Sequence, residues 1–330
     1  MLIGASIAAE NLAFYEPLFS GNDIMRIFPV DVTIGGADLK VLPRWSDSRL
    51  EYCRRKGTIP FLSCKVDGHA GGVERVRQQL EDMPAWIRDD PAMRVFITDR
   101  HEPEGDLAGG PDAYRRNFAR FLAMIDDLRP QIRDKVRCGP ILTQTWTENK
   151  KKGNFVYKTY DPGTGDFFGV DCYVPAGSDK KVISPAALPA PAEFLKHVKA
   201  YEFGPADKRP RIFPELGVIG MPADTDGSAR AAWLQGVHDE VSTWHPKAPG
   251  WQRRWSFLGW IWWNQRGKNT GRVAVIGGRR DFALDERTVD EHTVAKLNPP
   301  KPLNTFNAIW SAQRRPAVAR PHHAESLATG

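Results

Sequence analysis

The sequence has no apolar run of membrane-spanning length. No segment of the 330 residues approaches the roughly 18 consecutive apolar residues that a transmembrane helix needs. The chain leads from Met1 straight into an apolar run without the basic region and cleavage site of a secretory signal peptide. We therefore expect neither a membrane span nor a signal peptide, which leaves open a cytoplasmic location or an extracellular or virion location as a processed module.

Cysteine is scarce and charge is nearly balanced. The 4 cysteines are widely spaced and lie mainly in apolar runs, so we expect neither a disulfide framework nor a zinc cluster. A net charge of +6 over 330 residues is mild and slightly favours a neutral or acidic partner. The sequence also lacks a basic helix, a stacking module and a glycine-rich phosphate cradle. We therefore expect no nucleic-acid partner.

The chain is rich instead in short apolar runs that alternate with helical patterns. One such pattern places Tyr114, Phe118, Phe121, Ile125 and Leu128 on one helix face. Similar spacings predict helices over residues 73–83 before the fourth strand, 194–201 before the seventh, 233–244 after the seventh and 306–310 at the end. Strands joined by helices are parallel, and eight such units in a chain of this length favour an α/β fold, the (β/α)8 TIM barrel, over a doubly wound open sheet. The eight predicted strands cover residues 1–7, 24–28, 59–63, 94–100, 136–143, 167–173, 211–215 and 256–263.

The pattern predicts one barrel domain over residues 1–314 and a flexible tail over residues 315–330. The tail lacks apolar periodicity. Residues 145–165, after the fifth strand, have little helical periodicity and are predicted to form a loop on the catalytic face. This loop carries the Lys150–Lys152 run, interpreted either as a solvated surface or as an attraction for an anionic glycan.

Two glutamates at strand ends carry the main functional signal. Glu102 follows the fourth strand and Glu215 ends the seventh. Pro103 predicts extended backbone at Glu102, and a carboxylate in an apolar strand such as that of Glu215 is costly without a role. Cleavage of an acetal requires one carboxylic acid to protonate the leaving oxygen and a second carboxylate on the opposite side. In a retaining enzyme the two carboxyl groups should lie about 5–5.5 Å apart.

Other interpretations of these carboxylates remain open. Glu104 is the alternative acid/base, and otherwise a loop carboxylate or a substrate contact. The acidic stretch with His101 and Asp106 is alternatively a solvated loop or a divalent metal site, but we expect no metal because no other strand end offers a histidine. Glu215 alternatively forms a structural ion pair with Arg26 or Arg100.

The order of these motifs resembles the retaining (β/α)8 glycoside hydrolases, and most of all glycoside hydrolase family 26, the β-mannanase family. The matching segments are His101-Glu102, Glu215-Leu-Gly217, residues 59–63, residues 168–173 and residues 260–263. The resemblance implies that Glu102 is the acid/base, Glu215 the nucleophile and Tyr173 its hydrogen-bond partner. The sequence departs from the mannanases at residues 103–106, where they carry a stretch rich in glycine and tryptophan that helps hold the sugar, so the resemblance alone does not imply that mannan is the substrate.

The predicted function is therefore a retaining glycoside hydrolase that cleaves a polysaccharide or oligosaccharide without a cofactor. The alternatives are a non-catalytic carbohydrate-binding or structural barrel module of a cell-surface or phage-tail assembly, and a metal-dependent barrel hydrolase. Aromatic faces suit the C–H surfaces of sugars, so tryptophans at strand ends are candidate platforms. The predicted substrate contacts are Arg26, His101, Glu104, Trp146, Asp171, Tyr173, Trp262 and Trp263.

Overall fold

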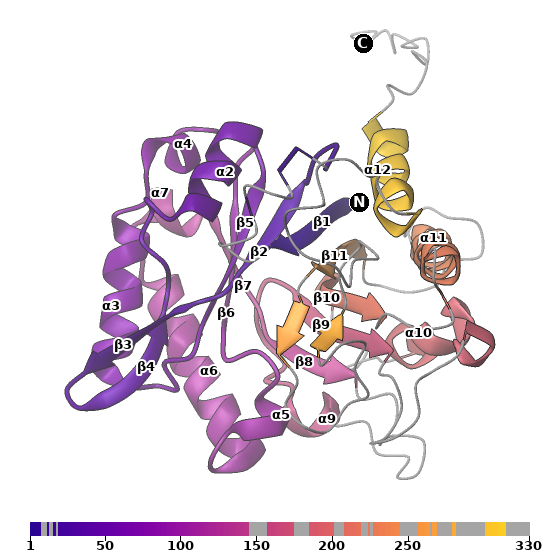
Figure 1. The fold of residues 1–330 in the computed structure, drawn as a ribbon. Coiled ribbons are helices and arrows are strands. Elements are labelled where there is room, and N and C mark those ends of the chain that lie inside the picture. The colour runs from indigo at the N-terminus through magenta and orange to yellow at the C-terminus, as the bar shows by residue number, and fades with distance from the viewer. Residues whose placement is uncertain are drawn as a thin grey trace, which may run out of the picture.

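A curled, parallel sheet surrounded by helices forms the centre of the molecule (Figure 1). The computed structural model describes residues 1–7, 12, 16–17, 19–144, 157–174, 185–200, 208–218, 224, 227–244, 256–264, 266–268, 279–281 and 301–314. The strands of the sheet are β1 (Leu2–Ile7), β2 (Ile24–Ile27), β5 (Ile59–Cys64), β6 (Val95–Asp99), β7 (Val136–Cys138), β8 (Ile141–Gln144), β9 (Phe168–Val174), β10 (Arg211–Val218) and β11 (Phe257–Asn264). Their order is β7-β6-β5-β2-β1-β11-β10-β9-β8.

The two edge strands of this sheet are consecutive in the chain. β7 pairs with β6 and β8 pairs with β9, and only Gly139 and Pro140 separate β7 from β8. The sequence predicted a single fifth strand here. Pro140 has no N–H to donate to a ladder, and at Gly139 a Cβ would lie 2.4 Å from the carbonyl oxygen of Phe167. The predicted closed barrel of eight strands is therefore corrected to a barrel-like sheet of nine strands whose pairing is interrupted at one place.

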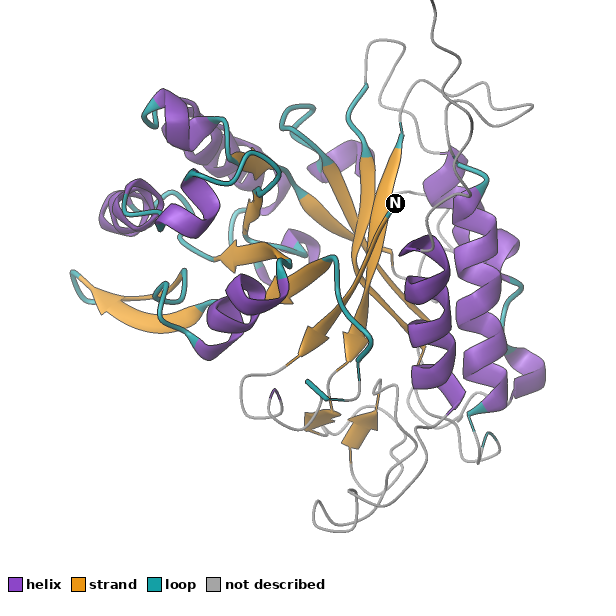
Figure 2. Ribbon diagram, turned by 90° about the horizontal axis from the view of Figure 1, so that it is seen from above, coloured by secondary structure: helices purple, strands orange, loops and turns teal. Residues whose placement is uncertain are grey.

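Helices cover the outside of the sheet on both sides of the molecule (Figure 2). The helical patterns predicted before the fourth and seventh strands, after the fourth and seventh, and at the end are confirmed as α3 (Ala70–Glu81), α10 (Pro191–Ala200), α6 (Gly110–Asp126), α11 (Ser228–Ser242) and α12 (Lys301–Arg314). No helix in the described ranges is long and apolar enough to cross a membrane. The helices are α2 (Ser48–Lys56), α3 (Ala70–Glu81), α4 (Ala85–Arg88), α5 (Pro103–Asp106), α6 (Gly110–Asp126), α7 (Pro130–Arg133), α9 (Tyr157–Tyr160), η2 (Pro185–Ala187), α10 (Pro191–Ala200), α11 (Ser228–Ser242) and α12 (Lys301–Arg314).

Two small antiparallel hairpins were missed by the sequence analysis. One pairs β3 (Val30–Ile34) with β4 (Ala37–Val41), and the other pairs β12 (Arg266–Lys268) with β13 (Arg279–Asp281). The first turns at Gly35 and Gly36, whose φ angles of 59° and 81° suit a tight hairpin turn. The alternation of apolar and polar residues over Val30–Ile34, followed by two glycines, could have predicted this hairpin from the sequence.

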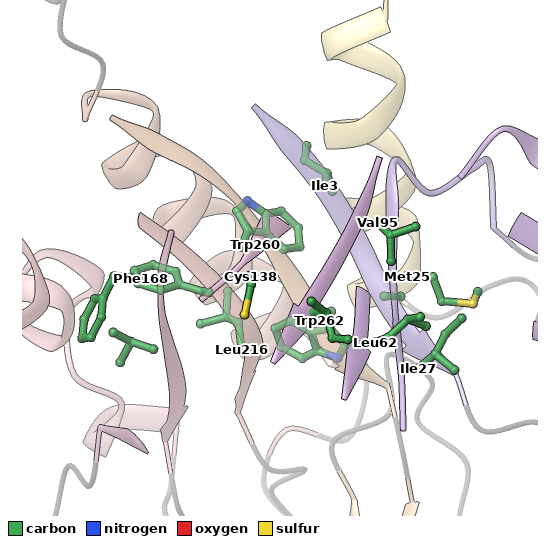
Figure 3. Close-up of a cluster of buried hydrophobic side chains, with 14 of the residues drawn as sticks. Ile3, Met25, Ile27, Leu62, Val95, Cys138, Phe168, Leu216, Trp260 and Trp262 are labelled. Carbon is green, nitrogen blue, oxygen red and sulfur yellow. The ribbon is translucent and has the colours of Figure 1, made fainter. Parts of the chain in front are cut away.

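Side chains alternate between the two faces of the curled sheet. The outer face packs against the helices through residues such as Leu62, Trp260 and Trp262 (Figure 3). The inner face begins with an apolar cluster made of Ile24, Phe61, Phe96, Ile141, Phe167, Ile212 and Ile261. Two residues further along β2, β5 and β6, the period of a strand brings Arg26, Ser63 and Thr98 to this same inner face. All three are buried, so a polar layer lies above the apolar one.

Candidate active site

The polar layer gathers predicted site residues from three strands. Because all strands of the sheet run parallel, their carboxyl ends meet at one edge. Arg26 comes from β2, Asp171 and Tyr173 from β9, and Glu215 from β10, while Glu102 lies just beyond the end of β6. The structure thus brings together both predicted catalytic glutamates and three of the predicted substrate contacts, as the hydrogen bond, ion pair and charge effects described below show.

A β-bulge turns Glu215 toward the interior. Phe213 and Leu216 both pack in the outer cluster although they are three residues apart, which a regular strand does not allow. The pairing of β10 shifts register between these residues, with β11 between Phe213 and Leu216 and with β9 between Ile212 and Leu216. The extra residue places Glu215 on the inner face instead of the outer one, a common use of bulges at active sites.

Glu215 is held by one hydrogen bond and one ion pair. The Tyr173 hydroxyl donates a hydrogen bond to Oε2 of Glu215. Nε of Arg26 lies 3.7 Å from Oε1 of Glu215, and the two side chains are 0% and 4% exposed. The Arg26 guanidinium itself lies over two aromatic rings, 4.6 Å from the centroid of Phe61 and 5.3 Å from that of Phe28. This packing fixes a positive charge beside the carboxylate.

Burial dominates the electrostatics of the two inner carboxyl groups. Burial raises the pKa of Glu215 to about 8, the charge of Arg26 and the Tyr173 hydrogen bond lower it, and the charge of Glu102 raises it. Burial also raises the pKa of Asp171 well above its usual range, and Glu215 and Glu102 raise it further. Asp171 is 0% exposed, and neither of its carboxylate oxygens has a hydrogen-bond partner in the described part of the chain. Asp171 therefore lacks the hydrogen-bond donor that Glu215 has in Tyr173.

Glu102 sits in a strained turn after β6. Arg100 and Glu102 have φ angles of 50° and 52°, in the left-handed region that residues other than glycine rarely adopt. The backbone N–H of Glu102 donates to the carbonyl oxygen of Ile141 at 3.0 Å, and Arg100 forms an ion pair with Asp67. These contacts with β8 and with the segment after β5 override the local influence of Pro103. The extended backbone predicted at Glu102 is therefore wrong.

His101 and Glu104 flank the acid/base candidate in different environments. The His101 ring makes an edge-to-face contact with Phe28, with ring centroids 5.6 Å apart. Burial, and then the charges of Arg26 and Lys65, lower the pKa of His101 well below its usual range, so the imidazole is neutral. Glu104 accepts a hydrogen bond of 3.0 Å from the backbone N–H of Thr143 in β8. Burial raises the pKa of Glu104 to about 8.

One of the predicted tryptophan platforms, Trp262, is placed differently. Trp262 is 0% exposed in the outer cluster between sheet and helices, so it cannot stack on a sugar, and this assignment is corrected (Figure 3). The alternation of β11 put its ring on the outer face, where Trp260 also lies. The Trp263 side chain, Trp146 and the Lys150–Lys152 run lie outside the described part of the structure, as does the predicted tail.

Several site residues were missed by the sequence analysis. Lys65 directly follows β5, and its charge lowers the pKa of both Glu215 and His101. Its place at the carboxyl end of a strand was the signal that could have found it. Thr143, which binds Glu104 only through its backbone, left no such signal. In the described ranges, no group of three histidine, cysteine or acidic residues is arranged to hold a metal ion.

Solved structures similar to this chain include a β-glucuronidase and a β-glycosidase. Bifidobacterium dentium β-glucuronidase matches with a TM-score of 0.52 and 14% identity, covering 94% of this chain and 46% of that one. The virulence factor SghA of Agrobacterium tumefaciens, bound to its substrate analog salicin, matches with a TM-score of 0.52 and 13% identity over 92% of this chain and 84% of that one. A Pyrococcus horikoshii β-glycosidase matches with a TM-score of 0.51 and 12% identity, covering 91% of this chain and 84% of that one.

These likenesses establish the fold of the chain. It is an α/β fold with a curled, barrel-like parallel sheet, as in these solved structures. The chain spans about half the length of the β-glucuronidase, with 46% of that protein covered. No protein-family model and no curated protein matches the sequence, so the resemblance to family 26 stays a prediction.

Proposed function

We propose that the protein is a retaining glycoside hydrolase, with Glu102 as acid/base and Glu215 as nucleophile. The observation that carries this proposal is the setting of Glu215. Its carboxylate is buried at the carboxyl ends of a parallel sheet, between the Arg26 guanidinium and the Tyr173 hydroxyl, within electrostatic reach of a second glutamate. A buried carboxylate with a fixed cation, a fixed donor and a carboxylate neighbour suits nucleophilic attack on an acetal carbon.

The proposed reaction proceeds in two displacements. In the first, Glu215 attacks the anomeric carbon while Glu102 donates its proton to the departing oxygen, which leaves a glycosyl ester on Glu215. In the second, Glu102 removes a proton from water as the water attacks the same carbon and frees Glu215. The Tyr173 hydroxyl and Arg26 stabilise the carboxylate before attack and after its release.

The similar structures suggest where a substrate search should begin. One neighbour is a β-glucuronidase and another is a β-glycosidase, so aryl β-glycosides and β-glucuronides belong in the first panel. The family 26 resemblance adds mannans and manno-oligosaccharides. Fold does not fix substrate, so glucans, xylans, galactans and acidic bacterial glycans complete the panel. The Lys150–Lys152 run remains the candidate attraction for acidic glycans.

Two variants test the catalytic assignment. Glu215→Gln should abolish turnover of every substrate, because an amide cannot attack, while ligand binding remains. Glu102→Ala should cleave only glycosides with activated leaving groups, and azide should restore turnover by attacking the accumulated ester in place of water. The product of that rescue should be a glycosyl azide that retains the configuration of the substrate.

The outcome of this test also separates the proposed enzyme from its alternatives. Binding of glycans with no hydrolysis across the panel, unchanged by Glu102→Ala, would favour the non-catalytic carbohydrate-binding or structural module. Activity that a chelator abolishes and a divalent ion restores would favour the metal-dependent hydrolase. Inversion of configuration in the product would overturn the double displacement even if both glutamates are essential.

A further inference from the structure

We propose that Glu104 is a positioning residue that holds the acid/base Glu102 in its strained turn by tying helix α5 to strand β8. This inference rests on the proposed function. Its starting point is the contrast between two glutamates two positions apart, of which one caps α5 and the other is bound to a neighbouring strand. The structure assigns them different tasks.

The turn that carries Glu102 is attached on both sides. On one side, the backbone N–H of Arg100 donates to the carbonyl oxygen of Cys64 at 2.8 Å, and the Arg100 guanidinium pairs with Asp67. On the other side, Glu102 N–H donates to Ile141, and Glu104 accepts from Thr143, with both bonds 3.0 Å long. A left-handed conformation at a residue other than glycine persists only where surrounding contacts determine it. Of the hydrogen bonds just described, only the one that Glu104 accepts joins a side chain to β8.

The surroundings of Glu104 do not suit an acid/base. Its Oε1 atom is engaged by Thr143, and its Oε2 atom is shielded from solvent without a hydrogen-bond partner among the described residues. A catalytic acid must reach the glycosidic oxygen of a bound sugar. A carboxyl group with one oxygen bound to the backbone and the other shielded is better suited to hold structure.

The groups that face Glu104 are acids or neutral hydroxyls. Glu102 raises its pKa, and the charge of Glu104 in turn raises the pKa values of Tyr114 in α6, Tyr160 in α9 and Asp171 in β9. Burial raises the pKa of Glu104 to about 8, and backbone N–H groups are the influences that lower it. At neutral pH the group is therefore protonated and adds no negative charge beside Glu102. Above about pH 8 its ionisation places a negative charge beside Glu102 in the turn, and the turn should loosen.

Aryl glycosides with graded leaving groups test this inference, on whichever sugar the wild type cleaves. Glu104→Ala should lower kcat/KM about 10- to 100-fold for poor leaving groups and much less for a dinitrophenyl glycoside, because the loss acts through misplaced acid catalysis. Glu104→Gln keeps an acceptor for Thr143 and should restore most of the lost activity. Azide should rescue neither variant, in contrast to Glu102→Ala. Glu74→Gln, on the exposed face of α3, is the matched control.

Amide hydrogen exchange gives a second readout that does not depend on activity. In Glu104→Ala, residues 100–107 and 141–144 should exchange at least about threefold faster than in the wild type, while Glu104→Gln stays close to it at pH 6. At pH 9 the wild type should exchange faster than Glu104→Gln in these segments. Unchanged exchange in Glu104→Ala would overturn the positioning role even in an inactive protein. Azide rescue of Glu104→Ala would instead make Glu104 the acid/base.

A wild type that cleaves no glycoside would overturn the proposed function alone. In that case the exchange experiment still decides whether Glu104 holds the turn. Equal losses for good and poor leaving groups in Glu104→Ala would mean that the residue supports the fold generally and does not act through Glu102. These outcomes keep the two proposals distinguishable.

Discussion

At the scale of single residues, the hydroxyl of Tyr173 controls the charge of the proposed nucleophile. Tyr173→Phe removes the hydrogen bond to Glu215, and because this bond lowers the pKa of Glu215, the pKa should rise further above its value of about 8. The ionised nucleophile then forms only at higher pH. We expect the acid limb of the kcat/KM profile to move to higher pH, and activity at pH 7 to fall about 10- to 100-fold.

The control for this variant is Tyr52→Phe. Tyr52 is also buried, but its hydroxyl accepts a bond from Asn22, away from the site. It should leave the pH profile unchanged. A Tyr173→Phe profile identical to that of the wild type would show that the hydroxyl does not govern Glu215.

Arg26 gives a second prediction, in which stability depends on pH. Arg26→Met keeps apolar contact with Phe28 and Phe61 but removes the charge that lowers the pKa of Glu215. At pH 6 Glu215 is protonated with or without Arg26, so the added loss of stability should be small. At pH 9 the variant must either bury an unpaired carboxylate or keep it protonated above its pKa. The melting temperature of Arg26→Met should therefore fall further below that of the wild type at pH 9 than at pH 6.

Part of this residue-level arrangement could be predicted from the sequence. Glu215, Tyr173 and Arg26 all lie at strand ends, and parallel strands bring such positions to one edge. The strained backbone at Glu102 could not be predicted, because it depends on hydrogen bonds to β8. Trp262 was misassigned because it stands in a run of tryptophans, and the sequence does not show which ring in that run points to the outer face of the sheet.

At the scale of elements, the interruption between β7 and β8 depends on Gly139. A Cβ at this position would lie 2.4 Å from the carbonyl oxygen of Phe167, which belongs to the backbone and cannot move aside cheaply. We expect Gly139→Ala to lower the free energy of unfolding by about 1–3 kcal/mol. Gly71→Ala is the control, because its Cβ would meet the Ile34 side chain at 3.0 Å. Denaturant unfolding of both variants checks the prediction, and equal stability would contradict it.

Element boundaries show where sequence patterns stop being informative. Periodicity located the strands of the large sheet, apart from the split between β7 and β8, and the helices α3, α6, α10, α11 and α12, because a buried face leaves a regular pattern. The bulge in β10 leaves no pattern, since Phe213 and Glu215 read as neighbours on one face until the register shift is known. The split of the fifth strand was marked by Gly139 and Pro140, but the apolar residues on both sides concealed it.

At the scale of the whole molecule, buried carboxyl groups should make the protein less stable as pH rises. Burial raises the pKa of Asp99 to about 7 and those of Glu104 and Glu215 to about 8, and it raises that of Asp171 as well. The folded state therefore keeps protons that the unfolded chain releases above about pH 4–4.5. These groups contribute their whole stabilisation of the folded state below about pH 4–4.5. This contribution decreases progressively as the pH rises to about 8.

Thermal unfolding between pH 5 and pH 8 checks this prediction. The melting temperature should fall across this range, and Glu215→Gln should flatten the fall and raise the melting temperature at pH 8 relative to the wild type. Glu74→Gln, at an exposed ion pair, should leave the slope unchanged. A melting temperature that rises from pH 5 to pH 8 would contradict it, because the paired surface carboxylates such as Glu16 titrate at lower pH.

The interrupted sheet has a mechanical consequence for the proposed chemistry. Glu102 is attached to the beginning of β8, beside the break, whereas Glu215 lies on β10, which is paired on both sides. Backbone segments without interstrand hydrogen bonds open locally at a lower free energy than paired strands do. The proposed acid/base is thus attached beside the interruption of the sheet, and the proposed nucleophile lies on a strand that is paired on both sides. Such an enzyme would tolerate leaving groups of varied bulk while discriminating strictly at the sugar that is attacked.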